Sequence, residues 1–371
     1  MHVLVTGGAG FIGSHTADVL HAASHRVRVF DSLDRQVHEG QAWPAYLRDD
    51  VERIHGDVRD RSAVASALEG IDAVVYLAAA VGVAQSMYEV QRYVEVNSGG
   101  MAVLLDLLVT TTHRVRKLVV ASSMSLYGEG ACRCPRCGPC AVDLRPESQL
   151  TRRDWSVRCP DCHAETAPLP TPESQRLRPS SVYAISKRDH EELALAVGRA
   201  YDIPTVALRY FNAYGARQSL SNPYNGIAAI IASRLLSGQP PILFEDGLQT
   251  RDFVHVSDIA RANQLALETS GADGLTVNVG SGRGLSLHHV ATILSNALGV
   301  QVLPEVTQQY RPGDVRHCYA DLTLARERLG FEPAVLPENG LADLALWLRG
   351  QPAIDRVARA RDELRARGLL R

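Results

Sequence analysis

A chain of 371 residues is longer than one small hydrophobic core covers, which predicts either two lobes or one large α/β unit with additions. Its 46% hydrophobic and 22% charged residues supply a packed core, so collagen-like and largely disordered structures are excluded. The formal net charge of −2, with no long block of like charge, gives no basis for binding a polyanion by bulk electrostatics. Any phosphate that the protein holds must be held by a local site.

Short β-rich runs alternate with helical stretches through the first half of the chain. Apolar residues recur at helical spacing in segments such as 11–20 and 94–108. The predicted strands are residues 2–6, 27–31, 72–78, 117–122 and 205–210. This alternation predicts right-handed βαβ units and a doubly wound parallel sheet of the Rossmann type.

The pattern changes beyond about residue 215, where shorter strands, 241–245 and 275–279, lie between helices such as 227–236 and 287–298. This change predicts a smaller C-terminal α/β lobe. The terminal segment is rich in Arg, Ala and Leu, which predicts a polar-faced helix on the solvated surface. The expected division is a Rossmann domain at 1–130 and 164–215, an insertion at 131–163, a smaller lobe mainly at 216–350, and a terminal helix at 351–371.

The chain carries no predicted targeting or membrane segment. No apolar run has the roughly 18 to 20 residues that span a bilayer, and residues 2–6 already form a predicted strand. Six of the seven cysteines lie between residues 132 and 162, unlike the scattered cysteines of disulfide-bonded secreted proteins. We therefore expect no signal peptide and a cytoplasmic location.

A glycine-rich loop follows the first predicted strand. The pattern G-x-G-x-x-G, extended to G-x-x-G-x-x-G, comprises Gly7, Gly8, Gly10 and Gly13, with Phe11 and Ile12 opening an amphipathic helix. The missing side chains let the backbone approach a pyrophosphate, whose charge the helix N-terminus stabilises. Asp31, which ends the second predicted strand, is expected to accept from adenosine ribose hydroxyls. It favours NAD over NADP, a preference that the nearby Arg35 weakens.

Three polar side chains form a candidate catalytic group. Ser123 follows the strand 117–122, while Tyr183 and Lys187 are four residues apart and share one helix face. The Lys187 ammonium and the positive charge of a nicotinamide cofactor would favour the phenolate and lower the pKa of Tyr183 toward working pH. A serine hydroxyl nearby can then hold the substrate oxygen that loses or gains the proton.

The Cys-rich insertion has neither helical nor strand periodicity. Two C-x-x-C pairs, Cys134 with Cys137 and Cys159 with Cys162, are spaced just beyond the common zinc-ribbon range. Each tight turn presents two thiolates to one metal, so four of them predict a closed, structural zinc site. Alternative ligands are Cys132, Cys140 and His163. Redox thiols, a disulfide and a rubredoxin-like iron site are alternatives to zinc.

The place of the insertion in the chain predicts its place in the molecule. It lies between Ser123 and Tyr183, which must converge on one substrate. We therefore expect it to emerge at the mouth of the active site, where it could cap the pocket or contact a second subunit.

Nearly the whole chain, apart from the insertion and the terminal helix, resembles the extended short-chain dehydrogenase/reductases that act on nucleotide sugars. The motifs that carry this resemblance are residues 6–13, 56–58, 77–79, Asn97, 122–123, 127–128, Tyr183 with Lys187, 208–212, 250–256 and 311–314. The cofactor contacts that it implies, beyond the glycine loop and Asp31, are Asp57 (to adenine), Val58, Leu77, Ala78, Ala79, Asn97, Tyr183 and Lys187. The helices near 97–108 and 183–197 resemble those that pair subunits in this family, which implies a homodimer.

The resemblance also implies how a nucleotide-diphosphate sugar binds. Ser123 and Tyr183 would hold the C4 hydroxyl of the sugar. The other implied substrate contacts are Ser125, Asn212, Arg251, Arg311 and Asp314. Two guanidiniums suit a dianionic diphosphate because arginine makes bidentate contacts with phosphate.

Two positions narrow the reaction that the resemblance implies. Relatives that dehydrate the sugar carry an Asp-Glu pair where this chain has Met124 and Ser125, neither of which can protonate a leaving hydroxyl. The related 3,5-epimerases use a cysteine at the position of Ser125. What remains is 4-epimerisation through a transient 4-keto sugar. The stretches 122–130 and 218–224 resemble dTDP-L-rhamnose 4-epimerases most, followed by UDP-hexose and UDP-glucuronate 4-epimerases, and a GDP-sugar stays open.

Two other functional classes compete with an epimerase. The first is a catalytically silent NAD-binding sensor whose zinc ribbon contacts a protein or nucleic acid, and the intact Ser123, Tyr183 and Lys187 argue against it. The arginines that could form a nucleic-acid surface are Arg133, Arg136, Arg145, Arg152, Arg153 and Arg158. The second is a net oxidoreductase or decarboxylase, which would release NADH. We expect a nucleotide sugar and a second subunit as partners, and neither nucleic acid nor membrane.

Overall fold

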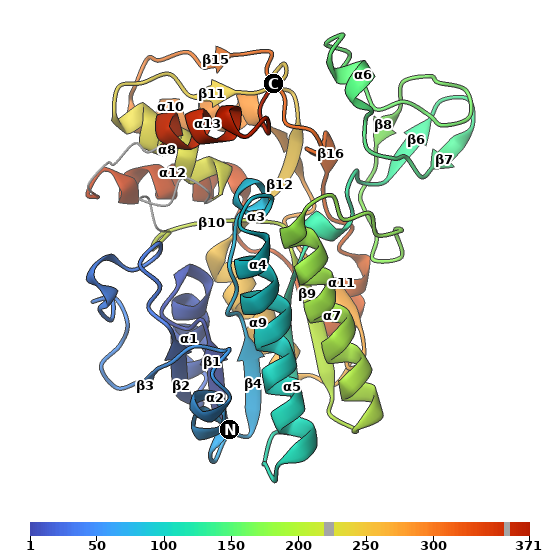
Figure 1. Ribbon diagram of the computed structural model, residues 1–371. Coiled ribbons are helices and arrows are strands. Elements are labelled where there is room, and N and C mark those ends of the chain that lie inside the picture. The colour runs from blue at the N-terminus through green and yellow to red at the C-terminus, as the bar shows by residue number, and fades with distance from the viewer. Residues whose placement is uncertain (219–225, 352–356) are drawn as a thin grey trace.

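The structure is a computed structural model that describes residues 1–218, 226–351 and 357–371 (Figure 1). Its main sheet has seven parallel strands in the order β13-β9-β5-β4-β1-β2-β3. Their bounds are β1 His2–Thr6, β2 Arg26–Asp31, β3 Glu52–His55, β4 Ala73–Tyr76, β5 Leu118–Ser123, β9 Thr205–Tyr210 and β13 Thr276–Val279. The strand order reverses beside β1, as in doubly wound folds, so the predicted Rossmann-type sheet is confirmed.

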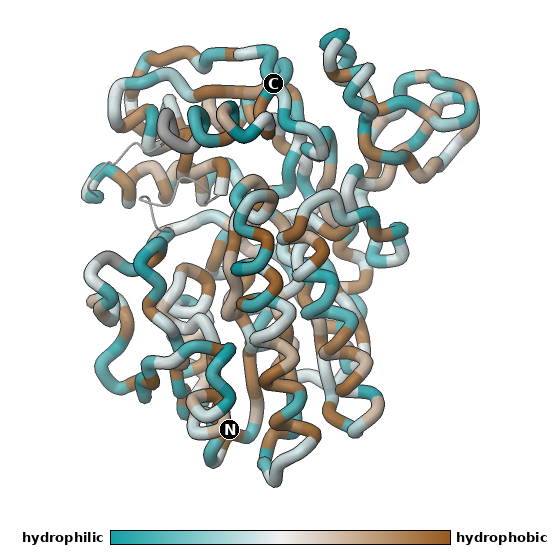
Figure 2. The backbone as a smooth tube through the Cα atoms, viewed as in Figure 1, coloured by the Kyte–Doolittle hydropathy of each residue, from teal (hydrophilic) through white to brown (hydrophobic). Residues whose placement is uncertain are grey.

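Helices cover both faces of the main sheet because its strands are apolar on both sides. Val3 and Val5 pack into one core cluster and Leu4 into another, as the two-residue period of a strand requires. One layer contains α2 (Arg61–Leu68), α5 (Gly100–Thr110) and α7 (Val182–Ala200); the other contains α1 (Phe11–Ala22), α9 (Val256–Glu268) and α11 (Thr323–Leu329). Figure 2 shows apolar and hydrophilic residues alternating along these helices, as expected where one helix face meets the sheet.

The smaller lobe has its own core and two short sheets. Its strands are β10 Asn212–Tyr214, β12 Thr250–His255, β14 Gly284–Ser286 and β16 His317–Cys318 in one sheet, and β11 Ile242–Leu243 with β15 Glu305–Val306 in the other. Its helices include α8 Ile227–Leu236, α10 Leu287–Leu298 and α12 Pro337–Leu348. The chain returns to the main sheet through β13, inside the segment 216–350 that the sequence assigns mainly to this lobe. Of the stretch 218–224, only Gln218 lies within the described residues.

The insertion is a small separate sheet that projects beside the smaller lobe (Figure 1). Its strands are β6 Cys132–Cys134, β7 Gly138–Cys140 and β8 Ala167–Pro168, and one turn of helix, α6, covers Glu147–Leu150. The third strand therefore lies beyond residue 163. Among the described residues, the buried apolar side chains of the insertion form only two small clusters, one of Cys132, Val142 and Val157 and one of Leu150 and Trp155 with Tyr310 of the smaller lobe. The insertion therefore lacks a substantial hydrophobic core of its own.

A continuous helical stretch runs through α4 (Val90–Tyr93), a π-helical turn (Val94–Gly99) and α5. By length and composition, Val90–Thr110 could cross a membrane, so the expectation that no segment has this character is wrong. Its inner face packs in the core beneath the sheet, where Met101 and Leu104 are buried. The apolar composition therefore serves the fold. The remaining short helices are α3 Val83–Ser86 and the 3-10 turns Glu39–Gln41 and Met124–Leu126.

The sequence predicts that the terminal segment is a helix on the solvated surface. The structure shows instead a segment that is partly buried. Helix α13 (Val357–Ala366) and the residues after it pack on the smaller lobe, with Leu364 and Leu370 buried. The backbone of Arg371 pairs with Tyr310 in both directions, with N···O distances of 2.8 and 3.0 Å. The prediction was wrong because arginines dominate the composition of the segment, and the two leucines that face the protein do not stand out in the sequence.

Candidate active site

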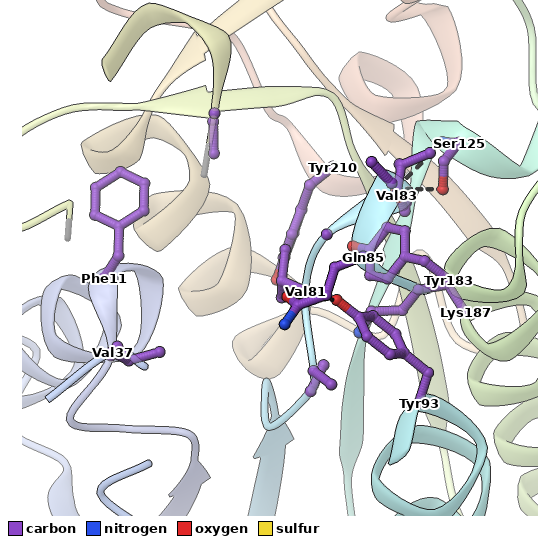
Figure 3. A pocket seen from close by; sticks show the side chains of 18 of the residues that line it. Phe11, Val37, Val81, Val83, Gln85, Tyr93, Ser125, Tyr183, Lys187 and Tyr210 are labelled. Carbon is purple, nitrogen blue, oxygen red and sulfur yellow. Dashed lines mark hydrogen bonds between the residues drawn. The ribbon is translucent and has the colours of Figure 1, made fainter. Parts of the chain in front are cut away.

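A cavity of about 760 Å³ lies where the carboxyl ends of the main-sheet strands meet the smaller lobe. This is where doubly wound sheets bind ligands, since loops diverge there on either side of the first strand. Phe11 and Val37 stand apart from Tyr93, Tyr183 and Lys187 across the cavity (Figure 3). The glycine loop and the candidate catalytic group therefore face one shared space.

The glycine loop leaves a space that side chains at its glycine positions would fill. Gly7 has φ of +66°, and a Cβ on Gly13 would lie 2.1 Å from the carbonyl oxygen of Gly7. Helix α1 begins after Gly10 with no side-chain cap and no acidic residue in its first turn, so its first N–H groups are not capped by a side chain. These features fit the pyrophosphate of a dinucleotide.

Asp31 ties the glycine loop to the end of β2. Its carboxylate accepts from the backbone N–H of Ala9 at 3.0 Å and of Leu33 at 2.9 Å, and it also lines the cavity. A carboxylate has about four lone-pair sites, so it keeps the capacity to accept from ribose hydroxyls. Arg35, in contrast, is exposed, donates to Gln41 at 3.0 Å, and is not part of the described cavity lining.

Most of the expected cofactor residues line the cavity. They are Gly7, Gly10, Phe11, Ile12, Gly13, Asp31, Asp57, Val58, Leu77, Ala78, Ala79, Tyr183 and Lys187. Gly8 and Asn97 lie behind this lining: a Cβ on Gly8 would lie 2.6 Å from a methyl of Val29, and Asn97 is fully buried. Both therefore support the site from beneath.

Ser123 and Tyr183 meet because helix α7 packs on strand β5. The start of α7 is fixed by Ser181, whose hydroxyl accepts from the backbone N–H of Ala184 at 3.1 Å, and this places Tyr183 in the first turn. Burial raises the pKa of Tyr183, and its hydrogen bond with Ser123 opposes that rise. A nearby positive charge would lower this pKa and favour the phenolate.

Lys187 lies one turn after Tyr183 and is held from two sides. Its Nζ donates to the carbonyl oxygen of Ala121 at 3.0 Å and lies 3.2 Å from Nδ1 of His190. The other ring nitrogen of His190 lies 2.9 Å from the carbonyl oxygen of Asn97, which can only accept, so Nδ1 is the acceptor toward Lys187. Burial lowers the pKa of Lys187 to about 7. The contact of His190 with Lys187 was not predicted from the sequence. The pattern that could have indicated it is a histidine one helical turn after the lysine.

Two further residues, which were not predicted from the sequence, lie beside the candidate catalytic group. The Tyr93 ring lies perpendicular to the Tyr183 ring, with centroids 6.4 Å apart, and its hydroxyl donates to Oε1 of Gln85 at 3.3 Å. Both residues line the cavity (Figure 3). They come from the segment after β4, where no short motif marks them.

Besides Ser123, the five other expected substrate residues, Ser125, Asn212, Arg251, Arg311 and Asp314, all line the cavity. The Ser125 hydroxyl donates to the Ser123 hydroxyl at 2.9 Å, so it contacts the candidate catalytic group (Figure 3). Oδ1 of Asn212 is buried and has no hydrogen-bond partner within the described chain. A buried acceptor without a partner is expected where a bound ligand supplies the donor.

The two expected arginines differ in how they are held. Arg251 donates to the carbonyl oxygens of Thr250 at 2.9 Å and Arg316 at 3.2 Å, and burial lowers its pKa. Arg311 donates through Nε to Asp314 at 2.8 Å and lies over the ring of Phe244. Both guanidiniums face the cavity from the smaller lobe, opposite the glycine loop.

A protein-family model, the NAD dependent epimerase/dehydratase family, matches residues 3–147 and 161–280. The chain belongs to this family. Among its curated relatives, the dTDP-L-rhamnose 4-epimerase of Burkholderia thailandensis is 34% identical over 93% of this chain and 94% of that protein. The putative UDP-glucose 4-epimerase of Methanocaldococcus jannaschii is 29% identical over 94% of this chain and 98% of its own length.

Solved structures of the epimerase/dehydratase family share the fold. UDP-glucose 4-epimerase of Thermotoga maritima, solved with UDP-glucose, is 30% identical, covers 94% of this chain and 99% of its own, and gives a TM-score of 0.77. UDP-glucuronic acid 4-epimerase of Bacillus cereus, solved with UDP-glucuronic acid and NAD, is 26% identical with the same coverages and a TM-score of 0.75.

The family match leaves out residues 148–160, inside the insertion. Within the insertion as a whole, the four predicted ligands Cys134, Cys137, Cys159 and Cys162 lie together. Their sulfur atoms are all within 4.8 Å of one another. A tetrahedral ion with bonds of about 2.3 Å needs sulfurs about 3.8 Å apart, so the group fits zinc. The alternative ligands Cys132 and Cys140 instead face each other, with sulfurs 3.4 Å apart, and His163 is outside the group.

The insertion does not cap the cavity directly. Among the described residues, none between 126 and 179 lines it. Instead, the buried guanidinium of Arg145 reaches the smaller lobe, donating to both oxygens of Glu245 at 2.9 Å and to the carbonyl oxygen of Asp314 at 3.0 Å. The insertion therefore touches the loop that carries Arg311 and Asp314 from behind. Because Arg145 is buried in this contact, it is not available to a nucleic-acid-binding surface.

Proposed function

We propose that this chain catalyses NAD-dependent 4-epimerisation of a nucleotide-diphosphate sugar. The observation that carries the proposal is the placement of Ser123, Tyr183 and Lys187 on one wall of a cavity that also contains the glycine loop. NAD bound at that loop supplies hydride acceptance and return at the sugar C4. No further acid or base is needed, because the same tyrosine removes and returns one proton.

Each residue of the catalytic group has a distinct role. Tyr183 takes the proton of the C4 hydroxyl, and Ser123 holds the same oxygen through its own hydroxyl. Lys187 contributes positive charge one turn away, and His190 with Asn97 fixes its ammonium in place. The Asn97 side chain is itself held, since Oδ1 accepts from the N–H of Ala80 at 2.7 Å.

The residues after Ser123 disfavour dehydration. Met124 is buried and apolar, and the hydroxyl of Ser125 is engaged with Ser123. Neither offers a carboxyl group to protonate a leaving hydroxyl or a thiol for inversion at C3 or C5.

We further propose dTDP-L-rhamnose or a related hexose as the sugar, on the resemblance to the Burkholderia relative. UDP-hexose, UDP-glucuronate and GDP-linked sugars are the alternatives. A panel of dTDP-, UDP- and GDP-sugars, with products identified by NMR, tests the choice. Conversion of none of them would contradict an epimerase and favour a silent NAD-binding sensor.

A substrate that carries deuterium at C4 is expected to yield a 4-epimer that retains the label at C4. The hydride leaves and returns within one closed redox cycle, so it never exchanges with water. NMR and mass spectrometry of the product measure the label. Substrate labelled at C5 is the control, and it should also keep its deuterium. Loss of the C4 label to solvent would contradict the mechanism.

The purified protein is expected to carry tightly bound NAD, which denaturation releases for detection by mass spectrometry. Gly13→Ala should abolish this retention, because its Cβ would lie 2.1 Å from the carbonyl oxygen of Gly7. Gly350→Ala is a matched control, since the nearest atom to its Cβ lies at 3.7 Å. The prediction fails if no dinucleotide is found and added NAD neither binds nor restores turnover.

We also propose that the four gathered cysteines bind one structural zinc ion and that the protein is a cytoplasmic homodimer. Exposed apolar side chains occur on two adjacent helical segments, Val90 and Val94 on one and Ile185 and Leu193 on α7. Exposed apolar side chains on adjacent helices fit a symmetric helix interface. Sedimentation equilibrium tests the dimer, and a monomer would contradict it.

A further inference from the structure

The C-terminal helix α13 contributes directly to the cavity of the proposed active site. Arg361 and Leu364 belong to its lining, together with Phe244 and Arg311 of the smaller lobe. Figure 1 shows α13 at the same end of the molecule as α8 and α10. Buried Leu364 and the backbone pairing of Arg371 with Tyr310 fix the position of the segment. A helix that the sequence predicts to be solvated is thus a wall of the site.

The guanidinium of Arg361 is only partly satisfied by the protein. One terminal nitrogen donates to Oε1 of Gln309 at 2.9 Å. Its Nε is buried and has no hydrogen-bond partner within the described residues. A buried donor without a partner is unfavourable, so the site is better completed by a ligand that accepts.

The charges around Arg361 indicate the chemistry of that ligand. Arg251, Arg311 and Arg361 place three guanidiniums in the cavity lining of the smaller lobe and α13. The carboxylate beside them, Asp314, is paired with Arg311. Arg251 donates to backbone carbonyls, whereas Arg361 donates only to Gln309 within the described residues, so Arg361 keeps more of its donors for a ligand. A dianionic diphosphate fits such an excess of positive charge, because guanidinium binds phosphate oxygens bidentately.

We propose that Arg361 binds the diphosphate of the nucleotide-sugar substrate, which makes α13 a substrate-binding element. The inference rests on the proposed function, because it assigns one more residue to the same substrate. Gln309 positions the guanidinium, and Arg311 two residues later faces the same cavity. Substrate binding is therefore expected to depend on the docked C-terminal segment.

Calorimetric titration of the NAD-loaded protein with dTDP, UDP and GDP tests this proposal. Arg361→Gln is expected to weaken binding of the preferred nucleotide at least about tenfold and to raise KM by a similar factor, with kcat changed less than about twofold. Arg361→Lys keeps the charge without the bidentate geometry and should lose less affinity. The melting temperature of each variant verifies that the fold is intact.

Arg365→Gln is the matched control. Arg365 donates to the same Oε1 of Gln309 at 3.3 Å but is exposed and outside the described cavity lining. Its substitution should leave nucleotide affinity unchanged, which separates a ligand contact from simple loss of the Gln309 bond. Equal affinity in Arg361→Gln and wild type would overturn the role of Arg361. If wild-type protein binds no nucleoside diphosphate, both this role and the proposed function are overturned.

Discussion

Tyr183→Phe is expected to lower the kcat of epimerisation by at least about a hundredfold, because removal of a general base typically costs a factor of 10² to 10⁴. The phenyl ring remains in place, and only the hydroxyl that hydrogen-bonds Ser123 is lost. Retention of NAD should be nearly unchanged, since the glycine loop and Asp31 are untouched. Steady-state kinetics and the NAD content of the same preparation measure both effects.

Tyr93→Phe is a matched control for the loss of one hydroxyl in the same cavity. Its ring faces that of Tyr183, but its hydroxyl donates to Gln85 rather than to Ser123. We expect a much smaller loss of kcat than in Tyr183→Phe. Ser123→Ala should also cost less, because it removes a hydrogen bond to the reacting oxygen and not the base. Near wild-type turnover in Tyr183→Phe would exclude this tyrosine as the base.

Local sequence patterns predicted most of the main sheet. Strands 2–6 and 205–210 have the predicted bounds, and the other three early strands were found with shifts at their ends. Strand β3 was missed because Glu52–His55 is a largely polar edge strand, without the apolar run that marks central strands. The join of β13 to the main sheet was also missed, since pairing with β9 depends on contacts between distant residues.

As in the fold, some residues of the candidate site follow from local sequence patterns. Others depend on contacts between distant segments. The glycine loop and the Tyr183–Lys187 pair follow from spacing along the chain, and the structure brings them to one cavity. Arg361 was missed because its contact with Gln309 joins distant segments. The pairing of Arg145 with Glu245, 100 positions apart, left no local signal either. Residues that act through tertiary contacts carry no mark in a single sequence.

The purified protein is expected to contain about one zinc ion per chain, and Cys134→Ser with Cys159→Ser should remove it. Four thiolates from two turns form a closed tetrahedral shell, and the insertion buries too few apolar residues to fold without it. The metal-free insertion should therefore become sensitive to protease. Metal analysis and limited proteolysis measure these effects. Cys140→Ser, outside the group of four, is the control that should keep the metal.

Loss of zinc should also weaken substrate binding while leaving NAD in place. The main-sheet core does not include the insertion, so the glycine loop should survive. A disordered insertion would withdraw Arg145 from Glu245 and from the carbonyl of Asp314, freeing the loop that holds Arg311. We expect a KM increase of at least about tenfold, equivalent to about 1.4 kcal/mol. Less than a tenth of an equivalent of metal, in protein prepared with zinc and reductant, would refute the zinc site. Full activity in the double variant would refute its link to the substrate loop.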